Sequence, residues 1–259
     1  MDRNRLGIPA LAAAALAAFT LGLALSVGSA QPYTGSGTPP VPHCREQHAQ
    51  DFLVRGNWQT KARMSPEERA ARRALAERAV RYRTENYGYF EGFGRPEWNE
   101  RTPMQNAERT TFFGKPVKLN RRILPALSCV EAAIRAECGA TPYQPQRLSG
   151  IRDRNTYHNG EVSNHVYGIA LDVDPTRNTC CHCVAPWNEH PLCRARTETI
   201  WERMVMPECW VRVFERYGFY WLGHDQLEDT MHFEFLGEPD RILDTTHPVP
   251  TTDAGAPLP

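Results

Sequence analysis

Two short stretches of this chain, residues 163–174 and 229–234, limit how it can fold. They read SNHVYGIALDVD and DTMHFE. From position 169 to 174 branched apolar residues alternate with Ala and Asp, which predicts a strand with one apolar face. In the second stretch His232 and Glu234 alternate with apolar residues in the same way. The fold must bury both apolar faces and leave His and Asp side chains on the other face of each strand.

These polar side chains form a recognisable ligand set. Gly168 allows a tight turn into the first strand, so we expect a loop to bring His165 close to Asp172. Two imidazoles and one carboxylate, here with His232, are the ligands of a catalytic zinc that keeps one position for water. Asp229, which a turn can bring beside His232, is the proton carrier that a zinc hydrolase needs. Taken singly, each residue has an ordinary alternative, a packed His or a turn Asp.

The N-terminus reads as a secretory signal peptide. A short charged start precedes an apolar run over residues 6–27 and three small residues at 28–30. The run is also long enough for an uncleaved anchor, which is the alternative. Without residues 1–30 the chain has 28 basic and 29 acidic residues, because two of 30 basic and one of 30 acidic residues are removed. This balance argues against nucleic acid and against an anionic membrane surface as partners. We expect no stable membrane insertion once the signal is cleaved.

All eight cysteines lie beyond the predicted signal. An even number in an exported chain predicts disulfides, although eight cysteines allow 105 pairings. Cys129 and Cys138 are nine residues apart on a predicted helix, on opposite faces, so they cannot bond each other. The CCHC run at 180–183 has two interpretations, a second metal site or disulfides in a loop near the site. An exported chain favours the disulfides.

The remaining patterns predict an α+β chain with an N-terminal helical extension. Ser65 followed by Pro and Glu predicts a helix start, and that helix should run to about residue 84. The aromatic segment 87–94 either faces substrate or packs this helix onto the main domain. Further helices are predicted over 120–138 and 198–217, the latter broken near Pro207, and strands over 147–152, 168–174, 219–221 and 231–236. The expected segments are a signal peptide (1–30), a linker (31–43), the extension (44–110), the main domain (111–240) and a disordered tail (241–259).

The two motifs together resemble those of a known family. SxHxxGxAxD at 163–172 followed by DxxHFE at 229–234 is similar to the M15 metallopeptidases. That family includes D-Ala-D-Ala carboxypeptidases, vancomycin-resistance dipeptidases and phage endolysins that cut L-alanyl-D-glutamate bonds. SGIR at 149–152, GFYWLG at 218–223 and VKL at 117–119 also agree, so the resemblance covers about residues 111–238.

The resemblance implies a role for each matching residue. His165, Asp172 and His232 would bind Zn²⁺. Asp229 would take a proton from the zinc-bound water and pass it to the leaving amine, and Arg152 would hold the peptide carbonyl or a substrate carboxylate.

Three more residues receive weaker assignments. Ser163 is implied to position substrate, Trp221 to line the substrate site and Glu234 to orient a metal-bound His. The ordinary alternatives are a core Trp and an exposed strand Glu. This chain departs from the family at Ile151, where Tyr is usual, and in the Cys-rich insertion 179–193.

The resemblance implies a Hedgehog/DD-peptidase-like fold with a small, mostly antiparallel sheet. It also implies a monomeric, exported bacterial enzyme, periplasmic or extracellular, that hydrolyses an amide bond in a peptidoglycan stem peptide. It does not choose between carboxypeptidase and endopeptidase action. One alternative is a catalytically silent zinc-containing module that binds cell wall or a partner. Another is a disulfide-stabilised protein without metal.

Overall fold

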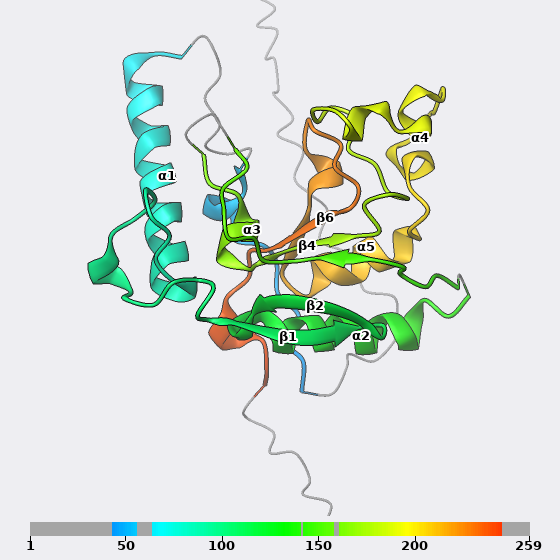
Figure 1. Ribbon diagram of the computed structural model, residues 1–259, viewed down its shortest axis with the longest axis horizontal. Coiled ribbons are helices and arrows are strands. Elements are labelled where there is room, and N and C mark those ends of the chain that lie inside the picture. Colours follow the sequence, from blue (N-terminus) through cyan, green and yellow to red (C-terminus); the bar gives the residue numbers. More distant parts are fainter. Residues whose placement is uncertain (1–42, 56–63, 141, 158–160, 245–259) are drawn as a thin grey trace, which may run out of the picture. The chain divides into compact units, whose positions relative to one another are not determined.

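Two antiparallel sheets organise the computed structural model, which describes residues 43–55, 64–140, 142–157 and 161–244. A four-stranded sheet has the order β3-β4-β6-β5, and a separate hairpin pairs β1 with β2 (Figure 1). The strands are β1 (Ala107–Phe112), β2 (Lys115–Asn120), β3 (Leu148–Ser149), β4 (Ala170–Val173), β5 (Phe219–Trp221) and β6 (His232–Phe235). The predicted signal peptide and nearly all of the predicted linker and tail lie outside the described residues.

Within the described ranges, five α-helices and several 3-10 turns accompany the sheets, so the α+β class is confirmed. The α-helices are α1 (Pro66–Tyr87), α2 (Leu124–Glu137), α3 (Asn164–Tyr167), α4 (Pro191–Arg194) and α5 (Glu208–Arg216). The 3-10 turns are Asp51–Leu53, Pro96–Trp98, Arg121–Ile123, Trp187–Glu189, Ile200–Arg203, Leu222–His224 and Pro239–Arg241. None of the helices among the described residues combines the length and apolarity that a membrane crossing requires.

The helix α1 begins where the sequence predicts. The Ser65 side chain accepts from the backbone N–H of Glu68, whose carboxylate accepts in return from the Ser65 N–H. The helix continues to Tyr87, three residues beyond the predicted end, and stops at Gly88 with φ of 124°. A Cβ at Gly88 would lie 2.6 Å from the Pro103 nitrogen, so only glycine fits this turn.

The aromatic segment 87–94 packs the extension onto the main domain. Tyr87 is fully buried in the core, and Phe90 and Phe93 pack against the same cluster. These rings do not line the cleft described below. The packing interpretation is therefore the correct one of the two, and the substrate-facing one is wrong.

Three predicted boundaries need correction. Asn120 caps the 3-10 turn Arg121–Ile123 by accepting from the Arg122 N–H at 3.2 Å, and α2 follows it. The strand predicted over 147–152 is only β3, because Gly150 lies too close to the Lys118 carbonyl for a Cβ and Ile151 donates to that carbonyl at 2.9 Å. Within residues 198–207 only Ile200–Arg203 form a helical segment, a short 3-10 turn, and α5 starts after Pro207.

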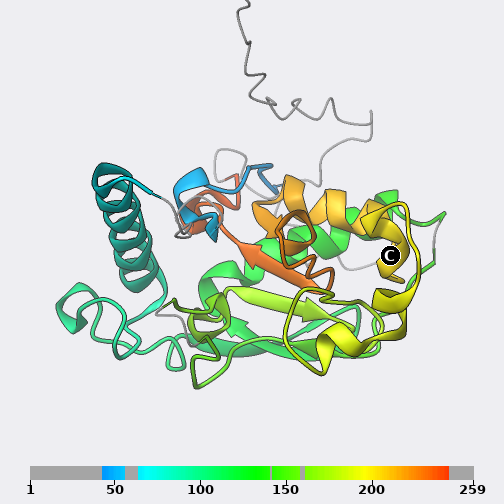
Figure 2. The same cartoon turned by 90° about the horizontal axis from the view of Figure 1, so that it is seen from above.

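The main core lies between α5 and the apolar face of the four-stranded sheet. The rings of Phe214 on α5 and Phe233 on β6 stack with centroids 4.1 Å apart. Phe235 and Leu171 are also fully buried in this cluster. The predicted alternation of β4 and β6 is confirmed, and their other face is left for polar side chains. In both views, α1 and the Cys-rich insertion of residues 179–193, called the Cys-rich loop below, lie on opposite sides of this sheet (Figures 1 and 2).

All eight cysteines form disulfides. The pairs are Cys44–Cys129, Cys138–Cys209, Cys180–Cys183 and Cys181–Cys193. Cys129 and Cys138 do not bond each other, as predicted. The first pair joins the N-terminal segment to α2, and the second joins the end of α2 to α5. Disulfides restrict the unfolded chain, so both pairs stabilise the packing of α2.

We predict that the Cys44→Ala/Cys129→Ala double variant loses roughly 2–4 kcal/mol of unfolding free energy. The bridge closes a separation of 85 residues, whereas Cys181–Cys193 closes only 12. A larger loop leaves the unfolded chain more entropy when its bridge is removed. Urea unfolding under non-reducing conditions measures the effect, with Cys181→Ala/Cys193→Ala as the matched control. A larger loss in the control would contradict the prediction.

Candidate metal centre

Two neighbouring strands deliver two of the predicted ligands to one face of the sheet. Asp172 on β4 lies directly opposite His232 on β6 in the antiparallel register. Side chains of directly opposed residues share a face and lie close together. Both residues are buried, with 4% and 3% of their surfaces exposed. The register therefore explains why a carboxylate and an imidazole meet here.

The third predicted ligand, His165, comes from the short helix α3 and not from a loop. Ser163 caps this helix by accepting from the His165 N–H at 3.3 Å, and Gly168 ends it with φ of 70°. A Cβ at Gly168 would lie 2.8 Å from the Asn120 nitrogen. This turn leads directly into β4, so His165 sits above Asp172.

The three side chains converge on one point. His165 Nε2 lies 3.1 Å from Asp172 Oδ1 and 3.2 Å from His232 Nδ1. His232 Nδ1 lies 2.9 Å from the same Asp172 oxygen. Ligand atoms about 2.0–2.2 Å from a tetrahedral zinc are about 3.3 Å apart. The spacing in this cluster of His165, Asp172 and His232, called the trio below, is therefore within a few tenths of an ångström of what a single metal ion requires.

The outer nitrogen of each imidazole has its own acceptor. His165 Nδ1 lies 2.7 Å from the Gly150 carbonyl oxygen, and His232 Nε2 lies 3.1 Å from Glu234 Oε1. When these outer nitrogens donate, His165 Nε2 and His232 Nδ1 carry lone pairs. Two lone pairs and a carboxylate oxygen then face each other with no donor between them. Such an arrangement needs a cation at its centre, either a metal ion or a proton.

In the metal-free site, the pKa values indicate that a proton occupies the position of the cation. Burial alone would lower the pKa of His232, but hydrogen bonds to Asp172 and Glu234 raise it to about 10. Burial lowers the pKa of His165, and its neighbour Asp172 only partly offsets this. Burial alone would raise the pKa of Asp172, yet His165 and His232 hold it well below its usual range. One imidazolium and one carboxylate thus share the site.

Asp229 lies in the turn that precedes β6 and lines the same cleft. Thr230 holds this turn, since its N–H donates to the Thr179 carbonyl at 2.7 Å and its hydroxyl accepts from the Thr179 N–H at 2.8 Å. Among the described residues, Asp229 Oδ1 is buried without a hydrogen-bond partner. Burial raises the pKa of Asp229 to about 7, the charges of Asp172 and Glu234 also raise it, and His232 lowers it. Asp229 is therefore a carboxyl group poised to exchange a proton near neutral pH.

The structure places the other candidate residues differently. Arg152 Nη2 pairs with Asp172 Oδ2 at 2.8 Å, and its side chain remains 35% exposed to the cleft. Ser163 lines the cleft but is 2% exposed and serves as the cap of α3. Trp221 is fully buried, stacks on Trp201 and does not line the cleft. Its indole N–H donates to the Thr230 carbonyl at 3.0 Å, so Trp221 supports the turn that carries Asp229.

A cleft of about 1100 Å³ opens over the trio. Its lining includes three arginines and three carboxylates, which are Arg55, Arg152, Arg154, Asp153, Asp172 and Asp229. The Cys-rich loop also lines the cleft, and in it Val184 is 78% and Trp187 is 40% exposed. The lining thus combines charged side chains of both signs with apolar ones.

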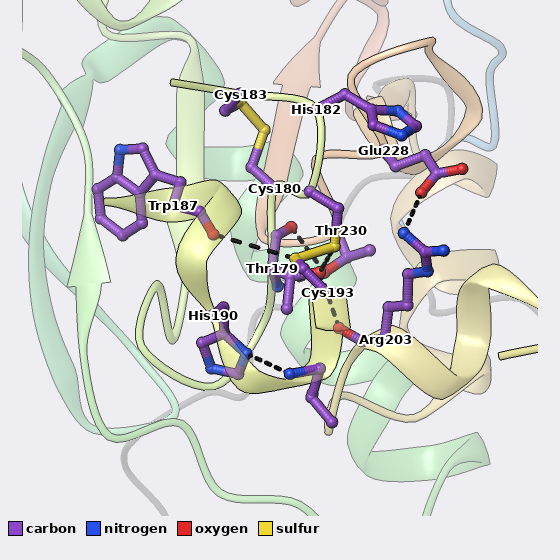
Figure 3. Close-up of a disulfide and its surroundings, with 12 residues drawn as sticks. Thr179, Cys180, His182, Cys183, Trp187, His190, Cys193, Arg203, Glu228 and Thr230 are labelled. Atoms are coloured by element: carbon purple, nitrogen blue, oxygen red, sulfur yellow. Dashed lines mark hydrogen bonds and ion pairs between the residues drawn. A yellow bond between two sulfur atoms is a disulfide. The ribbon is translucent and has the colours of Figure 1, made fainter. Parts of the chain in front are cut away.

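The Cys-rich loop is held by disulfides (Figure 3). Cys180, Cys181 and Cys183 are all oxidised, and His182 Nδ1 lies 2.7 Å from the Gln226 carbonyl oxygen. The interpretation of the CCHC run as a second metal site is therefore wrong, and the disulfide interpretation is confirmed. The backbone of Cys180 bridges that of Asp229, so the loop is joined to the site.

Sequence reasoning missed two residues beside the trio. The Gly150 carbonyl receives His165 Nδ1, and Asn164 lies next to His165 on α3 with 3% exposure. Asn164 has a polar side chain at a position that is fully enclosed, but nothing in the local pattern marks it as buried. The glycine in SGIR at 149–152 is Gly150 itself. Its residue type was the available indication of a close backbone approach at this position, because glycine has no side chain.

The comparisons with known proteins agree with the geometry. A family model of the M15 peptidases described as D-alanyl-D-alanine carboxypeptidase matches residues 157–235. The match spans the trio and Asp229 but leaves out Arg152 and the N-terminal extension. No curated protein and no solved structure matched the chain. The matched segment covers 79 of the 259 residues, and it supports an M15 family peptidase.

Proposed function

We propose that this protein is a zinc-dependent peptidase of the Hedgehog/DD-peptidase fold that hydrolyses an amide bond in peptidoglycan stem peptides. The observation that carries the proposal is the convergence of His165, Asp172 and His232 on one point beside Asp229. The donor set suits zinc, which prefers imidazole and carboxylate ligands and leaves a position for water in catalytic sites. The eight oxidised cysteines favour an exported protein, periplasmic or extracellular, where such a substrate is found.

In this proposal each residue around the metal site has its own role in amide hydrolysis. Zinc in such a site lowers the pKa of its bound water and polarises a carbonyl group. Asp229, whose pKa burial raises in the metal-free site, would accept a proton from the attacking water and return it to the leaving amine. Arg152 keeps donors free on its exposed edge and offers them to the substrate carbonyl or a substrate carboxylate. Gly150 and Glu234 keep the two imidazoles in the required orientation.

The walls of the cleft support an anionic peptide of some length. Stem peptides carry free carboxylates, and the exposed part of the Arg152 guanidinium can donate to one of them. The cleft volume of about 1100 Å³ is at the upper end of the range for small-molecule sites, so it has room for more than a dipeptide. The apolar wall at Trp187 suits aliphatic side chains along that peptide.

Defined muropeptides test the proposal directly. The zinc-loaded protein with intact disulfides is incubated with each muropeptide, and products are read by mass spectrometry beside a metal-depleted sample. Loss of one terminal D-Ala indicates a carboxypeptidase, and cleavage between L-Ala and D-Glu indicates an endopeptidase. Absence of any product from protein with one zinc per chain would overturn the proposal and leave a silent zinc-containing binding module.

Zinc binding is predicted to depend on pH through His232. In the metal-free protein its pKa is about 10, so at pH 7 zinc must displace a proton. Affinity should rise about tenfold per pH unit between pH 6 and 9, because one proton leaves for each zinc bound. Calorimetry in buffers of different ionisation enthalpy counts the released protons. An affinity that does not change over this range would contradict the prediction.

A further inference from the structure

The chain segment ahead of α1 contributes a side chain to the cleft. Residues 43–55 of this segment run past the end of β6, where the Gln50 N–H donates to the Leu236 carbonyl at 2.9 Å. Arg55, at the end of this range, lines the cleft. The N-terminal extension therefore supplies part of the cleft lining, although it lies outside the segment matched by the family model.

Arg55 contacts the segment that precedes α3. Its Nε donates to Glu161 Oε2 at 2.7 Å, and its Nη1 donates to the Tyr157 hydroxyl at 3.2 Å. The guanidinium also lies over the Tyr157 ring, with Cζ 4.5 Å from the ring centroid. The Arg55 and Glu161 side chains are only 11% and 15% exposed, so solvent weakens this ion pair little. Arg55 thus fixes both the ring and the hydroxyl of Tyr157.

The backbone of Tyr157 is held as well. Asn155 Oδ1 accepts from the Tyr157 N–H at 3.3 Å and from the Ser163 N–H at 3.1 Å. Asn155 Nδ2 donates to the Glu161 carbonyl at 2.6 Å and to the Tyr157 carbonyl at 3.3 Å. Because Ser163 caps α3, the helix that carries His165, these bonds fix the position of Tyr157 relative to the metal site.

The Tyr157 hydroxyl can donate a hydrogen bond into the cleft. It accepts from Arg55, and within the described part of the chain its own proton has no acceptor. Tyr157 lines the cleft, so an oxygen atom of a bound molecule can take this proton. Because Glu161 balances the charge of Arg55, the group offered to the cleft is a neutral donor. A neutral donor suits a peptide carbonyl oxygen, whereas a carboxylate gains more from a cationic one.

We propose that Tyr157 binds the substrate by donating to a backbone carbonyl of the stem peptide, and that Arg55 is the residue that positions it. The N-terminal extension thereby helps to form the substrate site. The inference rests on the proposed function for the identity of the substrate. It adds to that function a contact that lies outside the metal centre.

Binding of a muropeptide with the full stem pentapeptide to zinc-loaded Asp229→Asn protein tests the proposal, because this variant should bind without turnover. Calorimetry gives the Kd. Adding Tyr157→Phe removes the hydroxyl and keeps the ring beneath Arg55, so we expect the Kd to rise about 3–10-fold. Tyr143→Phe is the matched control, because its hydroxyl donates to Asp174 at 2.6 Å and it does not line the cleft. This control should leave the Kd unchanged.

Arg55→Lys in the same background tests the positioning role. Lysine keeps a charge beside Glu161 but lacks the planar fork that reaches both partners, so the Kd should rise. Once Tyr157→Phe is present, Arg55→Lys should weaken binding little further, because both changes act through one hydroxyl. In protein that retains Asp229, each single variant should raise KM and keep kcat within about twofold, as expected for a contact made equally before and during the reaction.

The outcomes separate this inference from the proposed function. An unchanged Kd in Tyr157→Phe, an equal rise in Tyr143→Phe, or full additivity of Tyr157→Phe and Arg55→Lys would overturn the inference. Weaker binding in Tyr157→Phe together with no cleavage of muropeptides by the wild type would support the contact and reject the peptidase. Cleavage by the wild type together with an unchanged Kd in Tyr157→Phe would do the reverse.

Discussion

A His232→Ala variant is expected to lose zinc and peptidase activity together. His232 contributes one of three atoms that lie 2.9–3.2 Å apart at the metal point, and no other described side chain takes its place. Removing an outer partner of a metal ligand typically weakens binding 10–100-fold, so removing the ligand itself should weaken it by more than about 100-fold. Zinc content after dialysis, measured by mass spectrometry of the metal, and muropeptide turnover report the two effects.

The matched control for this variant is His182→Ala. His182 also lines the cleft, but its Nδ1 is engaged with the Gln226 carbonyl and the cysteines around it are oxidised. We expect this control to keep one zinc per chain. Circular dichroism should confirm that both variants are folded, because the apolar faces of β4 and β6 are unchanged. Zinc retained by His232→Ala at the wild-type level would place the metal elsewhere and refute the assignment of the trio.

The local pattern predicted those parts of the site that depend on neighbouring residues in the chain. Alternation from residue 169 to 174 was enough for β4, and the same rule was enough for β6 and the shared face of His232 and Glu234. Ser65 marked the start of α1 because capping chemistry is local. The exclusion of a Cys129–Cys138 bridge followed from helix geometry alone.

The rest depends on contacts between distant parts of the chain. The strand predicted from 147 to 152 ends early because Ile151 pairs with Lys118, some thirty residues upstream. His165 lies on a helix of four residues, which is too short for a periodic signal. Tyr157 meets Arg55 only in the tertiary structure, because the two residues lie far apart in the chain. Trp221 looked like a cleft wall, yet packing places it beneath the turn that carries Asp229.

An Asp229→Asn variant should keep its zinc and lose most of its turnover. Asp229 is not one of the three converging ligands, so zinc content should remain at one per chain. Asparagine cannot accept the proton from water, and loss of a general base typically costs 10²–10⁴-fold in rate. The measurement is kcat on the muropeptide that the wild type cleaves, with zinc content determined on the same sample. Unchanged kcat would refute the role of Asp229.

The same variant should be more stable than the wild type when both are metal-free at pH 8. The pKa of Asp229 is about 7 in the folded chain, against 3.8 for an ordinary Asp, because burial disfavours its charge. The protonated Asp229 side chain therefore favours the folded state. This stabilisation is complete below about pH 4 and is lost as the pH rises through 7. Thermal unfolding at pH 5 and pH 8 should show a gap that widens with pH in favour of Asp229→Asn. A residue kept for structure would give the opposite sign, since its loss would destabilise the fold. A carboxylate that costs stability and is needed for turnover is the combination expected of a catalytic base.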